Sequence, residues 1–325
     1  MSLPISLIVD DPAPLINVYW WHLADAQQRK DPVLTSGEAV ARSIPLDFLS
    51  EFIDLIARWE VSGKFSVLPY PAGLGSIGDG WEGCDRRDLV RWLDLVRSQV
   101  APRMDITPEI LTHARALDLD RMTLLRENER DWAQHQTAAT LTPYIGYALQ
   151  LLNEVDLPAN GVTSPWDFGI EVEEEYQRAI HTAMKAVNGR SQTWYFLHQS
   201  NDLDSQSHVV HREDDEWLVS IWSQVNDGFW STMHEVGEGK AYIESVANHY
   251  LSEDGASGRL TELVEAGTPM VLCTHWQSLF SNGRRTGLRA LNEVCRRIQS
   301  VWGTGVQWTR CSDLAARVAA GQFGH

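Results

Sequence analysis

Three observations predict an α/β fold for this chain, in the form of an incomplete or distorted (β/α) barrel. Short apolar runs alternate with amphipathic helical segments along the 325 residues. The apolar runs are typical of strands buried on both faces, as in a parallel sheet covered by helices. About seven strand–helix steps follow one another, with no internal repeat and no low-complexity linker between them. A doubly wound sheet is the alternative with the same pattern.

The first third of the chain supplies two buried strands and two helices. Residues 5–9 (ISLIV) form an apolar strand that ends at Asp10, Asp11 and Pro12. A helix begins near residue 44 and ends before Gly63, a residue typical of helix C-termini. Residues 64–68 (KFSVL) form the second strand, and a loop rich in Gly and Pro leads to a helix over 85–100.

The remaining elements continue this alternation. An extended segment over 104–113 ends at His113, and a polar segment runs from there to His135. A hairpin insertion is predicted near 200–235, with its turn at Asn226, Asp227 and Gly228. Further strands are expected over 161–163, 192–198, 268–274 and 305–308. Further helices are expected over 140–154, 172–187, 241–250, 259–266, 286–301 and 312–320.

Composition narrows the class of protein. The formal net charge of −17 argues against nucleic acid as a partner, because phosphate backbones attract Lys and Arg. No apolar stretch approaches the length that crosses a bilayer, and the N-terminus has no basic start typical of a signal peptide. The four Cys residues form no CxxC pair. We therefore expect a cytoplasmic protein that contacts neither membrane nor nucleic acid; its oligomeric state is not indicated.

Polar residues with catalytic or metal-binding chemistry stand where the predicted strands end. Asp10 and Asp11 end the first strand, His113 the third, and His275 a late one, while residues 164–167 follow the fourth. In parallel α/β folds such residues meet at one edge. Two adjacent carboxylates suit a division of labour, in which one binds a cation and the other acts as a general base. Taken singly, the Asp pair is equally consistent with a turn before Pro12, and a single His113 or His275 is more often a satisfied polar residue than a ligand.

Taken in order, these segments resemble the polysaccharide deacetylase-like (NodB-homology) superfamily over most of the chain. LIVDD resembles the first family motif, which implies Asp10 as catalytic base and Asp11 as metal ligand. GKFSVLP resembles the next family strand, and VLCTH resembles the last motif, which implies His275 as general acid. The resemblance implies a distorted (β/α)7-type barrel with a small β-hairpin insertion, formed as a single domain over residues 1–325.

Two departures from the family pattern stand out. The second motif is a pair of His four residues apart, and here His113 is followed at that spacing by Leu117. His135 precedes the segment that resembles the next family helix, so we interpret residues 114–134 as an insertion and expect His113 and His135 both to bind the metal. The third motif begins with Arg in the family, but Thr163 stands at that position.

The resemblance implies a metal-dependent hydrolase that removes an acyl (acetyl) group from a carbohydrate or small glycoconjugate. A divalent cation, expected to be Zn²⁺, would lie on Asp11, His113 and His135 and activate water. We expect Trp166, Asp167, Trp276 and Trp20 to line the substrate cleft, since flat aromatic faces suit sugar rings; the chain has 14 Trp. The alternatives are a glycoside hydrolase with paired carboxylates, such as Asp10 or Asp11 with Asp167, and a catalytically degenerate sugar-binding barrel.

Overall fold

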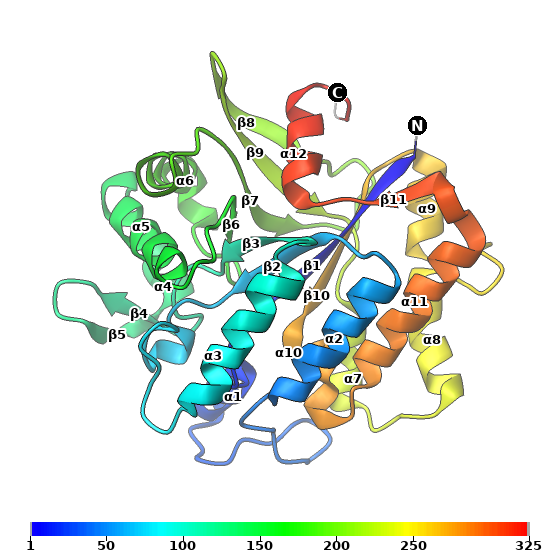
Figure 1. Cartoon of the computed structure of the whole chain (residues 1–325), viewed down its shortest axis with the longest axis horizontal. Coiled ribbons are helices and arrows are strands. Elements are labelled where there is room, and N and C mark those ends of the chain that lie inside the picture. Colours follow the sequence, from blue (N-terminus) through cyan, green and yellow to red (C-terminus); the bar gives the residue numbers. More distant parts are fainter. Residues whose placement is uncertain (1, 324–325) are drawn as a thin grey trace.

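The computed structural model describes residues 2–323 and has a five-stranded parallel sheet near its centre (Figure 1). β1 (Leu3–Asp10) lies between β10 (Met270–His275) and β2 (Gly63–Val67), and β2 pairs with β3 (Met104–Pro108). A short strand, β11 (Val306–Trp308), pairs with the beginning of β1. Every residue of β2 and β3 is buried, which explains why these segments lack an alternating polar pattern.

A second sheet completes the barrel. Its order is β6 (Val162–Thr163), β7 (Gln192–Gln199), β9 (Glu216–Ser223) and β8 (His208–Glu213), of which only β8 is antiparallel to its neighbour. Single parallel bridges join the two sheets, one between Glu109 and Thr163 and the other between Val225 and Leu272. The ladder is therefore not continuous, but seven parallel strands follow in the ring order β1, β2, β3, β6, β7, β9, β10. The predicted fold class is confirmed.

Helices pack around this ring because each buries an apolar stripe. In α2 the residues at helical spacing from Phe48 to Ile56 are buried, and α11 buries Leu288, Leu291 and Ile298 on one face. The helices are α1 (Val18–Gln27), α2 (Leu46–Arg58), α3 (Arg86–Leu95), α4 (Glu129–Ala133), α5 (Ala138–Glu154), α6 (Glu173–Asn188), α7 (Ser231–His234), α8 (Lys240–Tyr250), α9 (Arg259–Ala266), α10 (Trp276–Phe280), α11 (Thr286–Trp302) and α12 (Cys311–Ala319). Within residues 2–323, none of these helices is long and apolar enough to cross a membrane.

The C-terminal helix α12 closes the end of the barrel at which the strands begin. Its buried residues Leu314 and Val318 pack with Trp194 of β7 and Ile221 of β9 in one apolar cluster. Ser312 donates from its backbone N–H and its hydroxyl to Asp105, near the start of β3. The strands finish at the opposite end of the barrel (Figure 1).

Two predicted segments differ in the structure. The strand expected over 104–113 ends at Pro108, because Ile110 and His113 have φ values of 35° and 50° that no strand accommodates. The segment predicted as an insertion, 114–134, forms the hairpin of β4 (Arg115–Asp118) and β5 (Thr123–Asn128) and then α4.

The predicted hairpin near 200–235 is β8–β9, whose turn lies at Asp214 and Asp215. The prediction that the hairpin turn lies at 226–228 is wrong. Asp227 instead caps a short 3₁₀ turn, where its side chain accepts from the backbone N–H of Phe229.

Candidate active site

A pocket of about 330 Å³ lies at the carboxyl ends of the barrel strands. It brings together Asp10, Asp11, His113 and His275, which the sequence places at four separate points of the chain. None of its described lining residues is Lys or Arg. The lining comprises Asp10, Asp11, Tyr19, His22, Glu109, His113, Ser164, Trp166, Phe196, Leu197, Gln199, Trp230 and His275.

Asp10 is held by a buried ion pair with Lys64 of β2. The Lys64 ammonium also donates to Ser66 Oγ at 2.6 Å and to Thr163 Oγ1 at 2.8 Å, so all three of its donors have partners. Ser66 donates in turn to Asp10 Oδ1 at 3.0 Å. Asp10 Oδ1 thus carries the contacts with Lys64 and Ser66, while Oδ2 accepts, within residues 2–323, only from the Cys273 thiol at 3.7 Å.

Asp11, Glu109 and His113 form a second cluster, whose facing donor atoms lie within 4.8 Å of one another. His113 Nε2 is 2.7 Å from Asp11 Oδ1 and 3.7 Å from Glu109 Oε1. The Asp11 N–H donates to the other oxygen of Glu109, Oε2, at 2.5 Å. Although His113 Nε2 is close to Asp11 Oδ1, the two are not aligned as a hydrogen bond, and this buried oxygen has no hydrogen-bond partner.

The backbone around this cluster is bent so that its three side chains converge. Asp11 has a φ of 67°, so the backbone leaves the extended conformation of β1 at this residue. The buried Glu129 of α4 accepts from the backbone N–H of Thr112 at 2.9 Å and of His113 at 2.7 Å. Tyr144 donates to the same carboxylate at 2.7 Å. The helix after the hairpin therefore fixes the loop that carries Glu109 and His113.

A divalent cation fits this cluster by charge and by donor type. Burial raises the pKa of Glu109 well above its ordinary value, and the negative charges of Asp11 and Asp10 raise it further. Burial opposes ionisation of Asp11 as well, but the charges of His113 and His275 hold the pKa of Asp11 below its ordinary value. Two carboxylates and one imidazole thus face one point without a fixed cation between them, and oxygen and imidazole ligands are those that divalent metals take.

His275 is oriented by Asp227. The Asp227 carboxylate lies 2.8 Å from His275 Nδ1 and also accepts from the His275 backbone N–H at 3.1 Å. Burial by itself lowers the pKa of His275, but the hydrogen bond and charge of Asp227, helped by Asp11 and Asp10, raise it to about 9. The imidazole is therefore protonated at neutral pH, with Nε2 left to face a ligand.

Aromatic side chains form the outer wall of the pocket. Trp166 is 43% exposed, and its ring centroid lies 4.2 Å from that of His113 in an edge-on arrangement. His22 packs against both rings, and its Nε2 lies 2.5 Å from the His113 carbonyl oxygen. Trp230 stands edge-on to His275 at 5.1 Å. Trp166, predicted as a substrate-binding residue, is thus at the pocket mouth.

The structure does not bring His135 to the metal cluster. His135 follows α4 in a turn, where its backbone N–H donates to the Trp132 carbonyl oxygen. The position expected for a second His is instead held by Glu109, four residues before His113. His135 therefore lies outside this group, whereas Glu109, which precedes His113 by four residues, lies within it.

Three of the predicted substrate-binding residues lie elsewhere. Trp276 is 1% exposed and packs among the rings of Phe48, Phe52 and Phe65, so it belongs to the core. Trp20 lies on α1, where its ring meets Trp21 and the Arg42 guanidinium. Asp167 is exposed beside Arg130 at 3.7 Å, and neither Trp20 nor Asp167 lines the pocket.

Sequence reasoning missed three residues of the site: Lys64, Glu109 and Asp227. A Lys within a buried strand was one available signal, because an unpaired ammonium is costly to bury. The four-residue spacing of Glu109 and His113 was another. Thr163 stands where the family motif would have Arg. Lys64 of β2 donates to Thr163 and pairs with Asp10, so the positive charge beside Asp10 comes from β2.

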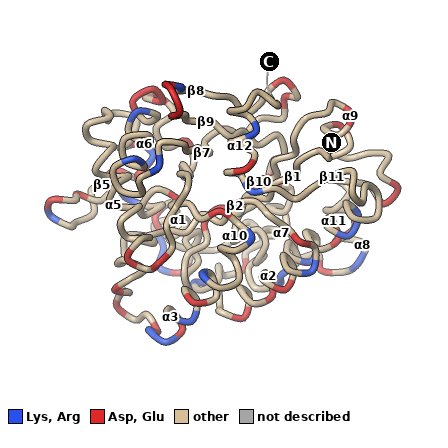
Figure 2. The backbone as a smooth tube through the Cα atoms, turned by 45° about the horizontal axis from the view of Figure 1, so that its top comes forward, with Lys and Arg blue, Asp and Glu red and all other residues tan. Residues whose placement is uncertain are grey.

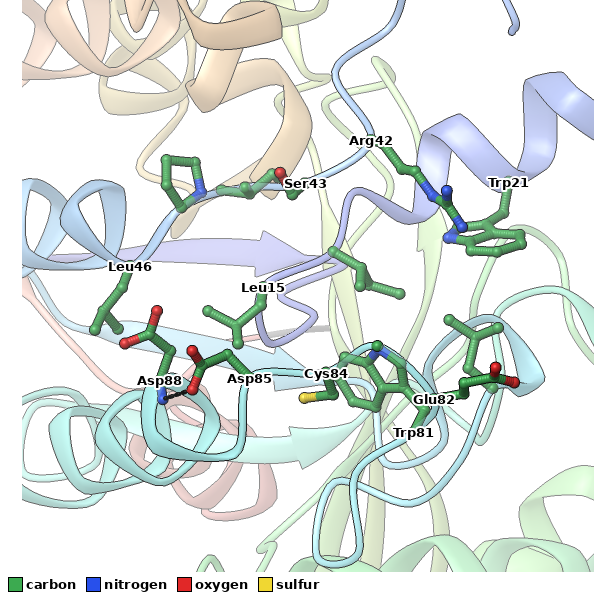
Figure 3. A pocket seen from close by; sticks show the side chains of 15 residues that line it. Leu15, Trp21, Arg42, Ser43, Leu46, Trp81, Glu82, Cys84, Asp85 and Asp88 are labelled. Atoms are coloured by element: carbon green, nitrogen blue, oxygen red, sulfur yellow. Dashed lines mark hydrogen bonds between the residues drawn. The ribbon is translucent and has the colours of Figure 1, made fainter. Parts of the chain in front are cut away.

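A larger cavity of about 530 Å³ lies outside this site, between the loop after β1, the segment before α2 and the loop before α3 (Figure 3). Its charged side chains Arg42, Glu82, Asp85 and Asp88 are exposed. Asp85 accepts from the backbone N–H of Asp88 and so caps α3. The cavity brings together no buried base, acid and metal-ligand set, and we assign the chemistry to the smaller pocket.

We expect Lys64→Met to destabilise the protein by about 3–5 kcal/mol, because it leaves the Asp10 carboxylate buried without its cation. Urea denaturation measures this loss. Lys30→Met, at an exposed position, should change the free energy of unfolding by less than about 0.5 kcal/mol. A loss below about 1 kcal/mol for Lys64→Met would contradict the structural role of the pair.

We expect Asp227→Asn to lower the pKa of His275 from about 9 to near or below the ordinary value of about 6.5. In the wild type, the stability gained from the raised pKa is full below about pH 6.5 and disappears as pH rises through about 9. NMR titration of the His275 ring in chelator-treated protein measures the shift. Asp214→Asn, in the exposed β8–β9 turn, is the control, and an unchanged titration in Asp227→Asn would refute the assignment.

Comparison with known proteins supports the fold. No protein-family model and no curated protein sequence matches the chain significantly. Among solved structures, a probable polysaccharide deacetylase from Pseudomonas aeruginosa PAO1 aligns with a TM-score of 0.57 at 12% identity, over 99% of this chain and 92% of that chain. A second, from Mycobacterium smegmatis, gives a TM-score of 0.55 at 14% identity with the same coverage. The chain therefore shares the fold of these two solved polysaccharide deacetylase structures.

Proposed function

We propose that this protein is a metal-dependent hydrolase that removes an acyl group from a carbohydrate or a small glycoconjugate. The observation that carries the proposal is the grouping of Asp11, Glu109 and His113 beside Asp10 and His275 in one pocket. A cation site, a carboxylate with a free oxygen and a protonated imidazole are the three parts that metal-assisted acyl hydrolysis needs. The related structures described as polysaccharide deacetylases supply the substrate class.

Asp11, Glu109 and His113 would hold the cation, through Asp11 Oδ1, Glu109 Oε1 and His113 Nε2. When bound, a divalent cation lowers the pKa of water and polarises the acyl oxygen. Its own charge also compensates the two adjacent carboxylates, since the described lining of the pocket includes no Lys or Arg. Zn²⁺ accepts both carboxylate and imidazole ligands. Mn²⁺ and Mg²⁺ bind carboxylate oxygen better than imidazole, and this site has two carboxylates and one imidazole. We therefore expect a smaller preference for Zn²⁺ than at the predicted site with two His.

Asp10 would accept the proton of the attacking water at Oδ2. Lys64 and Ser66 occupy Oδ1, so they hold the carboxylate in one orientation and leave Oδ2 with the Cys273 thiol as its one protein partner among the described residues. A base oriented in this way needs no rearrangement before the proton transfer.

His275 would donate a proton to the leaving amine or alkoxide from Nε2. Asp227 binds Nδ1, which fixes the ring and keeps it charged at neutral pH, since the pKa is about 9. Asp10 and His275 are paired neighbours on β1 and β10, so the base and the acid stand side by side at the end of the barrel. Activity that requires charged His275 would fall as pH rises through its pKa.

The glycoside hydrolase alternative receives less support. Asp167, its expected second carboxylate, is exposed and outside the pocket. A glycosidase also needs no metal, so inhibition by a chelator separates the two functions.

We expect His113→Ala to weaken binding of divalent metal by more than about 100-fold, because even changes to residues that only support a ligand cost 10–100-fold. It should also abolish acetate release from acetylated sugars. Calorimetric titration with Zn²⁺ and Mn²⁺ and elemental analysis of the purified protein measure the binding. His135→Ala is the matched control and should retain wild-type metal affinity.

The variant Glu109→His tests the donor set from the opposite direction. It should increase the affinity for Zn²⁺ relative to Mn²⁺, because imidazole replaces a carboxylate. Two results would exclude this cluster as the metal site. In one, metal-free wild-type protein binds neither Zn²⁺ nor Mn²⁺; in the other, Glu109→His leaves the ratio of the two affinities unchanged.

A further inference from the structure

We propose that a second compartment beside the catalytic pocket binds an apolar alkyl or aryl group attached to the substrate sugar. The identity of the sugar in this inference rests on the proposed function, whereas the existence of the compartment does not. The compartment has a volume of about 420 Å³ and lies between α1, the loop after β2 and the β4–β5 hairpin. We call it the hairpin compartment. Trp166 and His22 line both spaces, so a ligand in the catalytic pocket can extend past Trp166 into it.

The surface of the hairpin compartment is largely apolar. Leu124 of β5 is 40% exposed and Trp166 is 43% exposed, so two large apolar side chains that face water in the described structure line the same space. Trp21 and Leu74 add to this surface. Such side chains gain free energy when a ligand removes their surface from water.

Arg115 and Asn128, two polar residues at the rim, each have at least one partner within the protein. Arg115 donates from Nη2 to Asp25 Oδ1 at 3.0 Å. Asn128 accepts from the Asp131 N–H at 2.8 Å and donates to the Asp131 carboxylate at 2.9 Å, as the cap of α4. A second sugar ring requires several free hydrogen-bond partners, whereas an alkyl or aryl group does not. The chemistry of the wall therefore favours an apolar substituent.

The hairpin is fixed against the rim of the barrel, so the compartment is preformed. Leu124 lies so close to Gly73 that a Cβ at this glycine would be 2.6 Å from Leu124 Cδ1. Gly73 also has a φ of 73°, which disfavours any other residue. At the other end of the hairpin, the Glu129 N–H donates to the Ala114 carbonyl oxygen at 2.8 Å.

The test uses a series of β-glycosides of N-acetylglucosamine with methyl, butyl and hexyl groups. Calorimetry gives Kd, and acetate release gives kcat/KM. Each methylene that enters the compartment should tighten binding about twofold to fourfold, as expected for burial of apolar surface. Leu124→Asp should remove this dependence on chain length. Met122→Asp is the control, because Met122 lies on the same hairpin, is 44% exposed and does not line the compartment.

The outcomes separate this inference from the proposed function. Turnover of all three glycosides with no gain from methyl to hexyl would overturn the compartment and leave the hydrolase proposal standing. Binding that strengthens with chain length and is lost in Leu124→Asp, without acetate release, would support the compartment and contradict the hydrolase. An equal dependence on chain length in wild type and Leu124→Asp, with equal melting temperatures, would also overturn the compartment.

Discussion

The rest of the site depends on the ion pair between Lys64 and Asp10 inside the barrel. Burial of either charge alone would be costly, so the pair requires β1 and β2 to be adjacent and in their observed register. Ser66, Thr107 and Thr163 surround it with hydroxyl groups from β2, β3 and β6 that hydrogen-bond one another. This polar layer links the two sheets near the bridge between Glu109 and Thr163, where the ladder between them is weakest. The same interactions that stabilise the barrel therefore orient the proposed base.

The distribution of charge around the pocket explains why a cation is expected there. Lys64 compensates Asp10, and protonated His275 compensates Asp227. Asp11 and Glu109 remain, in contact with His113 and with no Lys or Arg among the described lining residues. Elsewhere Lys and Arg are interspersed with Asp and Glu on the outer helices and loops (Figure 2). The pocket thus concentrates negative charge where a divalent ion is the complementary ligand.

The fold was largely predictable because buried strands such as ISLIV are continuous apolar runs, and amphipathic helices such as α2 show a helical period in the sequence. The positions of Asp10, Asp11, His113 and His275 in one pocket also followed from parallel strands. Helix α1 was not predicted, since its apolar residues are not confined to one face. Glu109 and Asp227 could not be placed, because positive φ values at Ile110 and His113 and the cap at Asp227 depend on tertiary contacts. Trp166 and Trp276 each follow a predicted strand in the sequence. Only the packing in the folded chain shows that Trp276 is buried in the core and that Trp166 lines the pocket.

Anomalous diffraction from crystals of the protein soaked in Mn²⁺ tests the central claim most directly. The metal-site assignment predicts one strong peak bounded by Asp11 Oδ1, Glu109 Oε1 and His113 Nε2, with Asp10 and His275 beside it but paired with Lys64 and Asp227. A peak that involves His135, or no peak within the pocket at saturating Mn²⁺, would contradict the assignment of these residues as the metal site of a hydrolase.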